Sequence, residues 1–228
     1  LGLSGDEDGL QGYWKFNAGA DTIAYDHSGN ANHGDINGAS WIVSQTTYVP
    51  DDNFEQALID LGYDDILDDS VNTANISVVT DLDVSSKEIS DLTGIEDFTA
   101  LTDLDCEDNL LTSLDISNNT ALTWLHCFGN QLTALDVSNN AALTELRCGE
   151  NALTSLDVSA NTSLTLLRCQ DNQLAALDVS ANTALTNLKC FDNQLTALDL
   201  SNNTVLDEVH AGGNMFSSLD LSSNTVLN

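Results

Sequence analysis

Positively charged residues are scarce in this sequence: five Lys and Arg stand against 36 Asp and Glu, and the formal net charge is −31. Such an acidic chain is not expected to bind nucleic acid or an anionic membrane through its general surface. Long hydrophobic runs are missing as well, and without a stretch of about 18 apolar residues the sequence encodes no transmembrane helix. We also find no signal peptide and no initial Met, and therefore expect an internal piece of a longer protein.

Catalytic patterns are missing too. The sequence contains no GxSxG, HExxH or P-loop motif. No CxxC pair indicates a zinc or redox site. We therefore expect neither an enzyme nor a cofactor. The hydrophobic content of 42% nevertheless supports a real core.

From Leu101 onward the sequence repeats every 21 residues without a slip. Cysteine, asparagine and aspartate keep this period, and Ala211 takes the sixth cysteine position. The three columns are Cys106, Cys127, Cys148, Cys169 and Cys190; Asn109, Asn130, Asn151, Asn172, Asn193 and Asn214; and Asp115, Asp136, Asp157, Asp178, Asp199 and Asp220. A period of about 20–29 residues with the pattern L-x-x-L-x-L-x-x-N-x-L is the leucine-rich-repeat signature, here with Cys in the third apolar place.

One coil, residues 122–142, illustrates the predicted structure. Apolar and other side chains alternate as in a strand: Leu122, Leu125 and Cys127 point inward, and Trp124, His126 and Phe128 point outward. Asn130 follows where the chain must turn, and a buried amide there can pair with backbone groups of the turn and of the next coil. A single coil cannot bury its apolar face, so we expect a stack of parallel strands about 4.8 Å apart.

The segments before Leu101 prepare this stack. Residues 49–78 predict a helical cap, because Asp51 and Asp52 start a helix, Phe54 and Leu58 share its apolar face with Ala57 and Leu61, and Gly62 ends it. Residues 79–100 predict a first, divergent coil of 22 residues. The solenoid would then span residues 79–228 in seven coils, with an open C-terminal edge. VPDDNFEQALIDLG and LTGIEDFTAL resemble the cap and coil of internalin-like bacterial surface proteins.

Residues 1–48 differ in character, with many Gly, Asn and aromatic residues. They predict short strands, Gly12–Asn17 and Gly34–Asn37, separated by turn chemistry at residues 28–30. The stretch GLQGYWKFNAGADTIAYDHSGNANHGDINGASW resembles the opening of laminin-G/concanavalin-like jelly-roll domains. It covers only part of such a domain, so the resemblance implies no carbohydrate site. The alternative is a β-rich remnant that docks on its neighbour or stays partly flexible.

The repeated Cys and Asp columns each allow more than one interpretation. Zinc needs four converging ligands, and a straight column of inward cysteines does not converge, so we expect buried core thiols. The aspartates repel one another at ladder spacing, which calcium could offset, but hydrogen bonds from backbone N–H groups or hydroxyls of the neighbouring coil are the simpler expectation. An acidic loop with Asp64, Asp65, Asp68 and Asp69 is a weak calcium candidate, because it lacks the Gly and Glu of an EF-hand.

The strand face, meaning the outward side chains of the repeated strands, is where the coils differ. Three of the five Lys and Arg in the chain lie there in consecutive coils. Exposed aromatics beside cations are typical of a binding surface. The predicted ligand-contacting residues are Trp124, His126, Phe128, Arg147, Arg168, Lys189, Phe191 and His210. The alternative is that these cations only relieve the charge of a very acidic protein, with Glu145 and Glu208 beside them.

These observations predict a leucine-rich-repeat solenoid with parallel strands and little helix, preceded by a short β-rich, jelly-roll-like segment. The family resemblances imply a secreted or cell-surface recognition or adhesion module that binds a protein or polysaccharide. The period alone implies only the scaffold. Two alternatives remain: a structural spacer in a long surface protein, or a substrate-holding accessory region of a larger enzyme.

Overall fold

The computed structural model describes residues 23–24, 34–35 and 45–227, and the chain divides into two compact units, Leu1–Gln45 and Thr46–Asn228. In the first unit, strands β1 (Ile23–Ala24) and β2 (Gly34–Asp35) pair antiparallel. The predicted strand over residues 12–17 lies outside the described residues. In the described part of the chain, no helix is long and apolar enough to cross a membrane.

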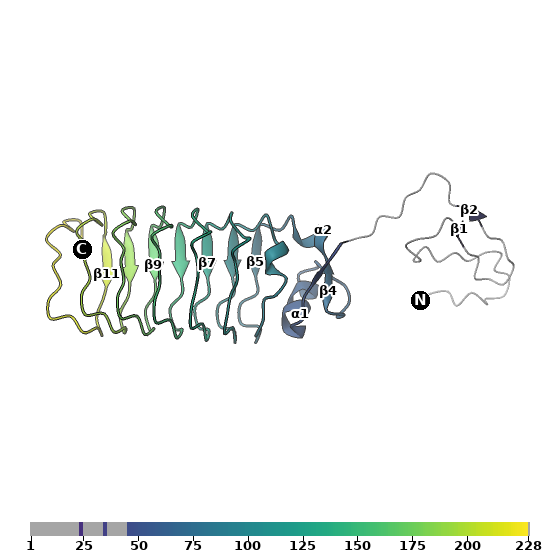
Figure 1. The fold of residues 1–228 in the computed structure, drawn as a ribbon, viewed down its shortest axis with the longest axis horizontal. Coiled ribbons are helices and arrows are strands. Elements are labelled where there is room, and N and C mark those ends of the chain that lie inside the picture. The colour runs from purple at the N-terminus through teal and green to yellow at the C-terminus, as the bar shows by residue number, and fades with distance from the viewer. Residues whose placement is uncertain (1–22, 25–33, 36–44, 228) are drawn as a thin grey trace. The chain divides into compact units, whose positions relative to one another are not determined.

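The second unit is a solenoid whose strands form one parallel sheet of seven (Figure 1). Each strand is three residues long, and the strands neighbour one another in chain order. They are β5 (Asp81–Asp83), β6 (Asp103–Asp105), β7 (Trp124–His126), β8 (Glu145–Arg147), β9 (Leu166–Arg168), β10 (Asn187–Lys189) and β11 (Glu208–His210). The prediction of a parallel-strand solenoid with little helix is confirmed.

The core fills the interior of the coils. In the coil of residues 122–142, Leu125 and Cys127 of the strand side meet Leu132 and Val137 of the back wall, and all four are fully buried. The equivalent positions are buried in the neighbouring coils as well. Because a fully buried Leu or Val contributes about 1.5–3 kcal/mol, the repeated apolar columns supply the main driving force for stacking.

Backbone hydrogen bonds join the coils well beyond the short strands. Thr144 N–H donates to the Thr123 carbonyl at 2.8 Å, and Cys127 N–H donates to the Arg147 carbonyl at 2.9 Å. At the turn after each strand from β6 to β11, an asparagine amide completes the pattern. Asn130 pairs with its own turn, as predicted, and donates to the Cys127 carbonyl at 3.2 Å. Its partner in the stack is the preceding coil and not the next one, because it donates to the Cys106 carbonyl at 3.0 Å.

The second unit begins with a small layer of other elements beside β5 (Figure 1). Strand β3 (Thr46–Tyr48) pairs antiparallel with β4 (Ser70–Asn72), and between them lies helix α1 (Asp52–Asp60). Short helix α2 (Thr73–Ile76) and the 3-10 turn η1 (Ile95–Asp97) follow.

Two details of this layer differ from expectation. Residues 46–48 were assigned to the N-terminal segment, but their pairing with β4 places them in the second unit. Leu61 was expected on the buried face of α1 with Phe54 and Leu58. It is exposed, because the helix ends at Asp60 and the chain turns away before Gly62, which has a φ of 82°.

Candidate functional site on the strand face

The register of the sheet aligns the outward side chains of the strands into two columns. The first residues of β6 to β11 form one column, and the third residues form the other. The second column is Asp105, His126, Arg147, Arg168, Lys189 and His210. The structure therefore brings together the cations that the sequence analysis singled out.

His126 was expected to be an exposed contact residue, and the structure corrects this. Its side chain is only 4% exposed. The Nε2 atom lies 2.8 Å from Glu145 Oε1, and the Nδ1 atom lies 3.5 Å from Asp105 Oδ2. The Trp124 ring lies against the imidazole, with ring centroids 3.4 Å apart. Acids on both neighbouring coils and an aromatic ring on its own strand therefore enclose it.

Glu145 connects His126 to Arg147, the next outward residue of strand β8. Arg147 Nε lies 2.6 Å from Glu145 Oε1, an ion pair without the geometry of a hydrogen bond. Burial alone would raise the pKa of Glu145, but the hydrogen bond from His126 and the charge of Arg147 outweigh it and hold the pKa below its usual value. The Arg147 guanidinium carbon also lies 6.0 Å from the centre of the Trp124 ring, within the range of a cation–π contact.

The cations of the later coils differ in their partners. Lys189 Nζ lies 3.3 Å from Glu208 Oε1, and His210 Nε2 lies 2.9 Å from the same oxygen. Hydrogen bonding from Lys189 lowers the pKa of Glu208. Among the described residues, Arg168 makes no ion pair, and its Nε atom is buried without a hydrogen-bond partner. Phe128 and Phe191 are half-buried beside these columns.

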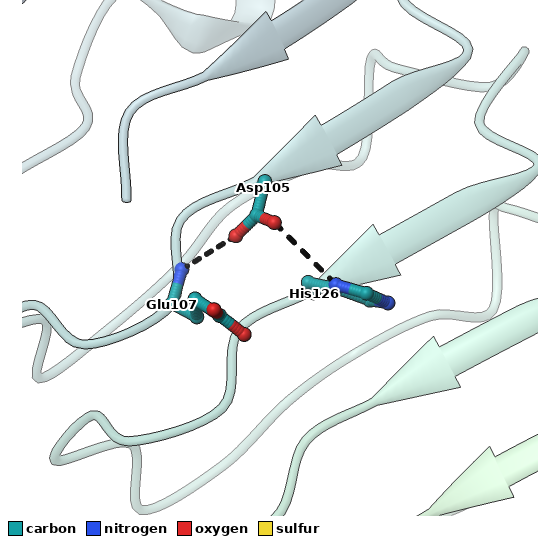
Figure 2. Close-up of side chains that lie close together, drawn as sticks. All are labelled: Asp105, Glu107 and His126. Carbon is teal, nitrogen blue, oxygen red and sulfur yellow. Dashed lines mark hydrogen bonds and ion pairs between the residues drawn. The ribbon is translucent and has the colours of Figure 1, made fainter. Parts of the chain in front are cut away.

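Next to the cations lies an acidic cluster that sequence reasoning missed (Figure 2). Asp105, Glu107 and His126 each offer one ligand atom, and these atoms all lie within 4.8 Å of one another. Glu107 N–H donates to Asp105 Oδ1 at 3.1 Å. Burial and the nearby Asp105 charge raise the pKa of Glu107. The 21-residue alignment of Asp105 with His126 was the available signal.

The acidic loop is the other place where a cation was considered. Asp65, Asp68 and Asp69 are exposed, and Asp64 is half-buried. Burial raises the pKa of Asp64, and the charges of neighbouring acids add to this. In the part of the chain that the structure describes, the only group of three potential metal ligands is the one around His126.

The repeated Cys and Asp columns have structural roles. All five cysteines are free thiols in the buried core, and burial raises their pKa, for Cys190 to about 12. The aspartates of the back wall are satisfied within their own coil rather than by the neighbouring one. Asp136 Oδ1, for example, accepts from the Ser138 N–H at 2.9 Å, and the hydrogen bonds from Ser138 lower the pKa of Asp136.

Comparison with known proteins finds similarity in sequence and in structure to bacterial internalins. Internalin J from Listeria monocytogenes serotype 4b (strain F2365) is 42% identical over 72 residues, which are 32% of this chain and 8% of internalin J. The solved functional domain of InlJ from Listeria monocytogenes, described as including a cysteine ladder, is 42% identical with a TM-score of 0.76. That match covers 81% of this chain and 42% of the InlJ chain.

More distant similarities concern the fold alone. Internalin C2 from Listeria monocytogenes str. 4b F2365 is 22% identical with a TM-score of 0.61, over 81% of this chain and 96% of that chain. The family model described as LVIVD repeat matches residues 127–147, a span of one period. These comparisons give no support to the laminin-G-like resemblance of residues 1–48. They do support the resemblance of the solenoid to bacterial internalin-like repeat proteins.

Proposed function

We propose that this solenoid is a recognition or adhesion module of a bacterial surface, and that it binds a protein or polysaccharide through the strand face. The similarity to internalins supports a surface protein-interaction role and an extracellular or cell-surface location. One observation carries the choice of surface. In a chain with a net charge of −31, Arg147, Arg168 and Lys189 stand in adjacent register positions of one open sheet.

The contacts of these cations indicate the chemistry of the ligand. Arg147 and Lys189 each lie beside one glutamate, whereas Arg168, between them, has no carboxylate partner among the described residues. An anionic group on a ligand would therefore be held best at Arg168 and shared with its two neighbours. With strands about 4.8 Å apart, the three cations span about 10 Å. A ligand with several anionic groups along an extended chain fits this spacing.

The test uses a glycan and surface-protein array probed with the full chain. Exposed ion pairs contribute only about 0–1 kcal/mol each, so affinity should depend on several cations together. We expect the Arg147→Ala/Arg168→Ala/Lys189→Ala variant to lose binding, and we expect wild-type binding to weaken as salt rises. Lys87→Ala removes an exposed cation outside the seven strands and is the control for the loss of a single positive charge.

Each alternative predicts a different outcome. A structural spacer binds nothing on the array. A substrate-holding region of a larger enzyme binds glycans but no surface protein. If a ligand is found and the triple variant binds it as the wild type does, the strand face is not the site.

We further propose that residues 49–78 cap the first coil of the solenoid. Phe54 is fully buried, and its ring centre lies 6.3 Å from that of Phe98 in the first coil. Asp51 supports this contact, because its Oδ2 accepts from Ser90 Oγ at 2.7 Å. Phe54→Ala should cost about 3–5 kcal/mol in urea unfolding. Leu61→Ala, at an exposed site next to α1, should stay within about 0.5 kcal/mol.

A further inference from the structure

The two ring nitrogens of His126 each face a carboxylate, Nε2 that of Glu145 and Nδ1 that of Asp105. Nε2 lies 2.8 Å from Glu145 Oε1, so the Nε2–H tautomer donates to that carboxylate. In this tautomer Nδ1 carries a lone pair, and it faces the Asp105 carboxylate (Figure 2). A lone pair that faces an anion in a buried place is repelled unless a cation lies between them.

The distance between these two atoms fits two ligands of one metal ion better than a direct hydrogen bond. A charge-assisted hydrogen bond from nitrogen to a carboxylate is about 2.7–2.9 Å long. The separation of Nδ1 and Asp105 Oδ2 is 3.5 Å, which is too long for such a bond. Two ligands that each lie about 2.1 Å from a tetrahedral zinc ion are about 3.4 Å apart. The observed separation therefore matches that of two ligands of one metal ion.

Glu107 supplies a third ligand on the same side. Its carboxylate has an oxygen within 4.8 Å of both the Asp105 and the His126 ligand atoms, and rotation about its side-chain bonds can bring it closer. It comes from the chain just after β6, so the ligands bridge two adjacent coils. One imidazole nitrogen with two carboxylates is a donor set that suits a borderline divalent ion more than the hard ions Ca²⁺ and Mg²⁺.

The groups behind His126 have the arrangement that supports a metal-bound histidine. Metal-bound histidines usually donate their second ring N–H to a carboxylate or carbonyl, which fixes the ring orientation and the tautomer. Here Glu145 is the carboxylate that accepts from the second ring nitrogen of His126, through Oε1. Arg147 Nε lies 2.6 Å from that same oxygen. The imidazole is held further by the Trp124 ring. The ring is thus fixed before any ion arrives.

We propose that Asp105, Glu107 and His126 Nδ1 form a binding site for one divalent transition-metal ion such as Zn²⁺, with Glu145 as the supporting residue of His126. The site would clamp the coils of β6 and β7 together. Three protein ligands leave at least one coordination position for water or for a ligand on the strand face. This proposal is independent of the recognition role proposed above, because it needs no partner molecule.

The test is calorimetric titration of the full chain with Zn²⁺, after chelator treatment and without a histidine tag. Excess Mg²⁺ is present throughout, so that the many exposed carboxylates do not contribute. We expect one saturable site. The triple variant His27→Ala/His33→Ala/His210→Ala keeps His126 as the only histidine and should bind as the wild type does.

Three further variants test the assignment of the ligands. His126→Ala and Glu107→Gln should each weaken binding more than loss of the supporting residue, Glu145→Ala, for which we expect a loss of about 10- to 100-fold. Glu107 is half-buried at the surface, so Glu107→Gln should fold even if His126→Ala does not. Circular dichroism in the absence of metal checks folding for each variant.

Substitution of Co²⁺ for Zn²⁺ identifies the donor atoms. We expect visible d–d absorption and no thiolate-to-cobalt charge-transfer band, because all five cysteines are buried. Absence of saturable Zn²⁺ binding, wild-type affinity in folded Glu107→Gln, or a thiolate band would each overturn the proposal.

Discussion

Replacement of a single turn asparagine by alanine should show how strongly the coils are joined. Asn172 Nδ2 donates to the carbonyls of Cys148 at 3.0 Å and of Cys169 and Gln170 at 3.2 Å, and Asn172 Oδ1 accepts from Leu153 N–H at 2.9 Å. An amide nitrogen has only two hydrogens, so these contacts amount to about three full hydrogen bonds. At about 1 kcal/mol each, Asn172→Ala should lower the free energy of unfolding by about 3 kcal/mol.

The same coil offers a second buried asparagine as an internal comparison. Asn182 Nδ2 donates to the carbonyls of Val158 at 3.0 Å and Asn161 at 2.8 Å, while its Oδ1 is buried without a partner. Removing that oxygen offsets part of the loss, so Asn182→Ala should cost about 1–2 kcal/mol. Asn139 makes one long contact on the exposed surface, and Asn139→Ala should stay within about 0.5 kcal/mol.

Urea unfolding followed by circular dichroism gives the three free energies. Amide exchange gives a local check, because the Leu153 N–H should lose protection in Asn172→Ala and keep it in Asn182→Ala. If the three variants cost the same, or if Leu153 exchange does not change, the turn amide does not join the coils in the way the contacts indicate.

Three other results follow from burial, charge and space. The five thiols should react with a labelling reagent only after denaturation, even at mildly alkaline pH, because burial raises their pKa, for Cys190 to about 12; rapid labelling of the native protein would contradict this. Burial tends to raise the pKa of Asp51, but hydrogen bonds from Ser90 and from backbone N–H groups outweigh it and lower the pKa. The free energy of unfolding should therefore fall as pH drops below about 4. Asp51→Asn should reduce that pH dependence. Gly149→Ala should cost about 1–3 kcal/mol, because its Cβ would lie 2.8 Å from the Gln170 amide. The equivalent Gly212→Ala has no atom within 4 Å of the new Cβ and should be neutral in the same unfolding assay.

Much of the solenoid could be predicted from the sequence because its physics is local and repeated. The 21-residue period sets which side chains share a column, and the alternation along each strand sets which of them point inward. The buried positions of Cys127 and Leu125, and the turn role of Asn130, needed no information beyond this. The same period aligned Arg147 with Arg168 correctly.

The remaining details depend on contacts that the period does not contain. His126 occupies an outward position, yet it is buried because Trp124 and the acids of both neighbouring coils enclose it. The aspartates of the back wall accept hydrogen bonds from the serine two residues later in their own coil. This local Asx turn competes with contacts between coils. The start of the second unit at Thr46 depends on pairing with a strand more than 20 residues later.

The uniform bonding between coils has a consequence for the gene as well as for the fold. From β7 to β10, each coil presents the same threonine carbonyl, cysteine amide and asparagine side chain to its neighbour. Recombination that deletes or duplicates one 21-residue unit would therefore rejoin matching surfaces and keep the core continuous. It would also move every outward residue beyond the junction by one strand spacing relative to helix α1. The length of the array and the pattern on its outer surface can thus change in a single genetic event, without any new packing solution.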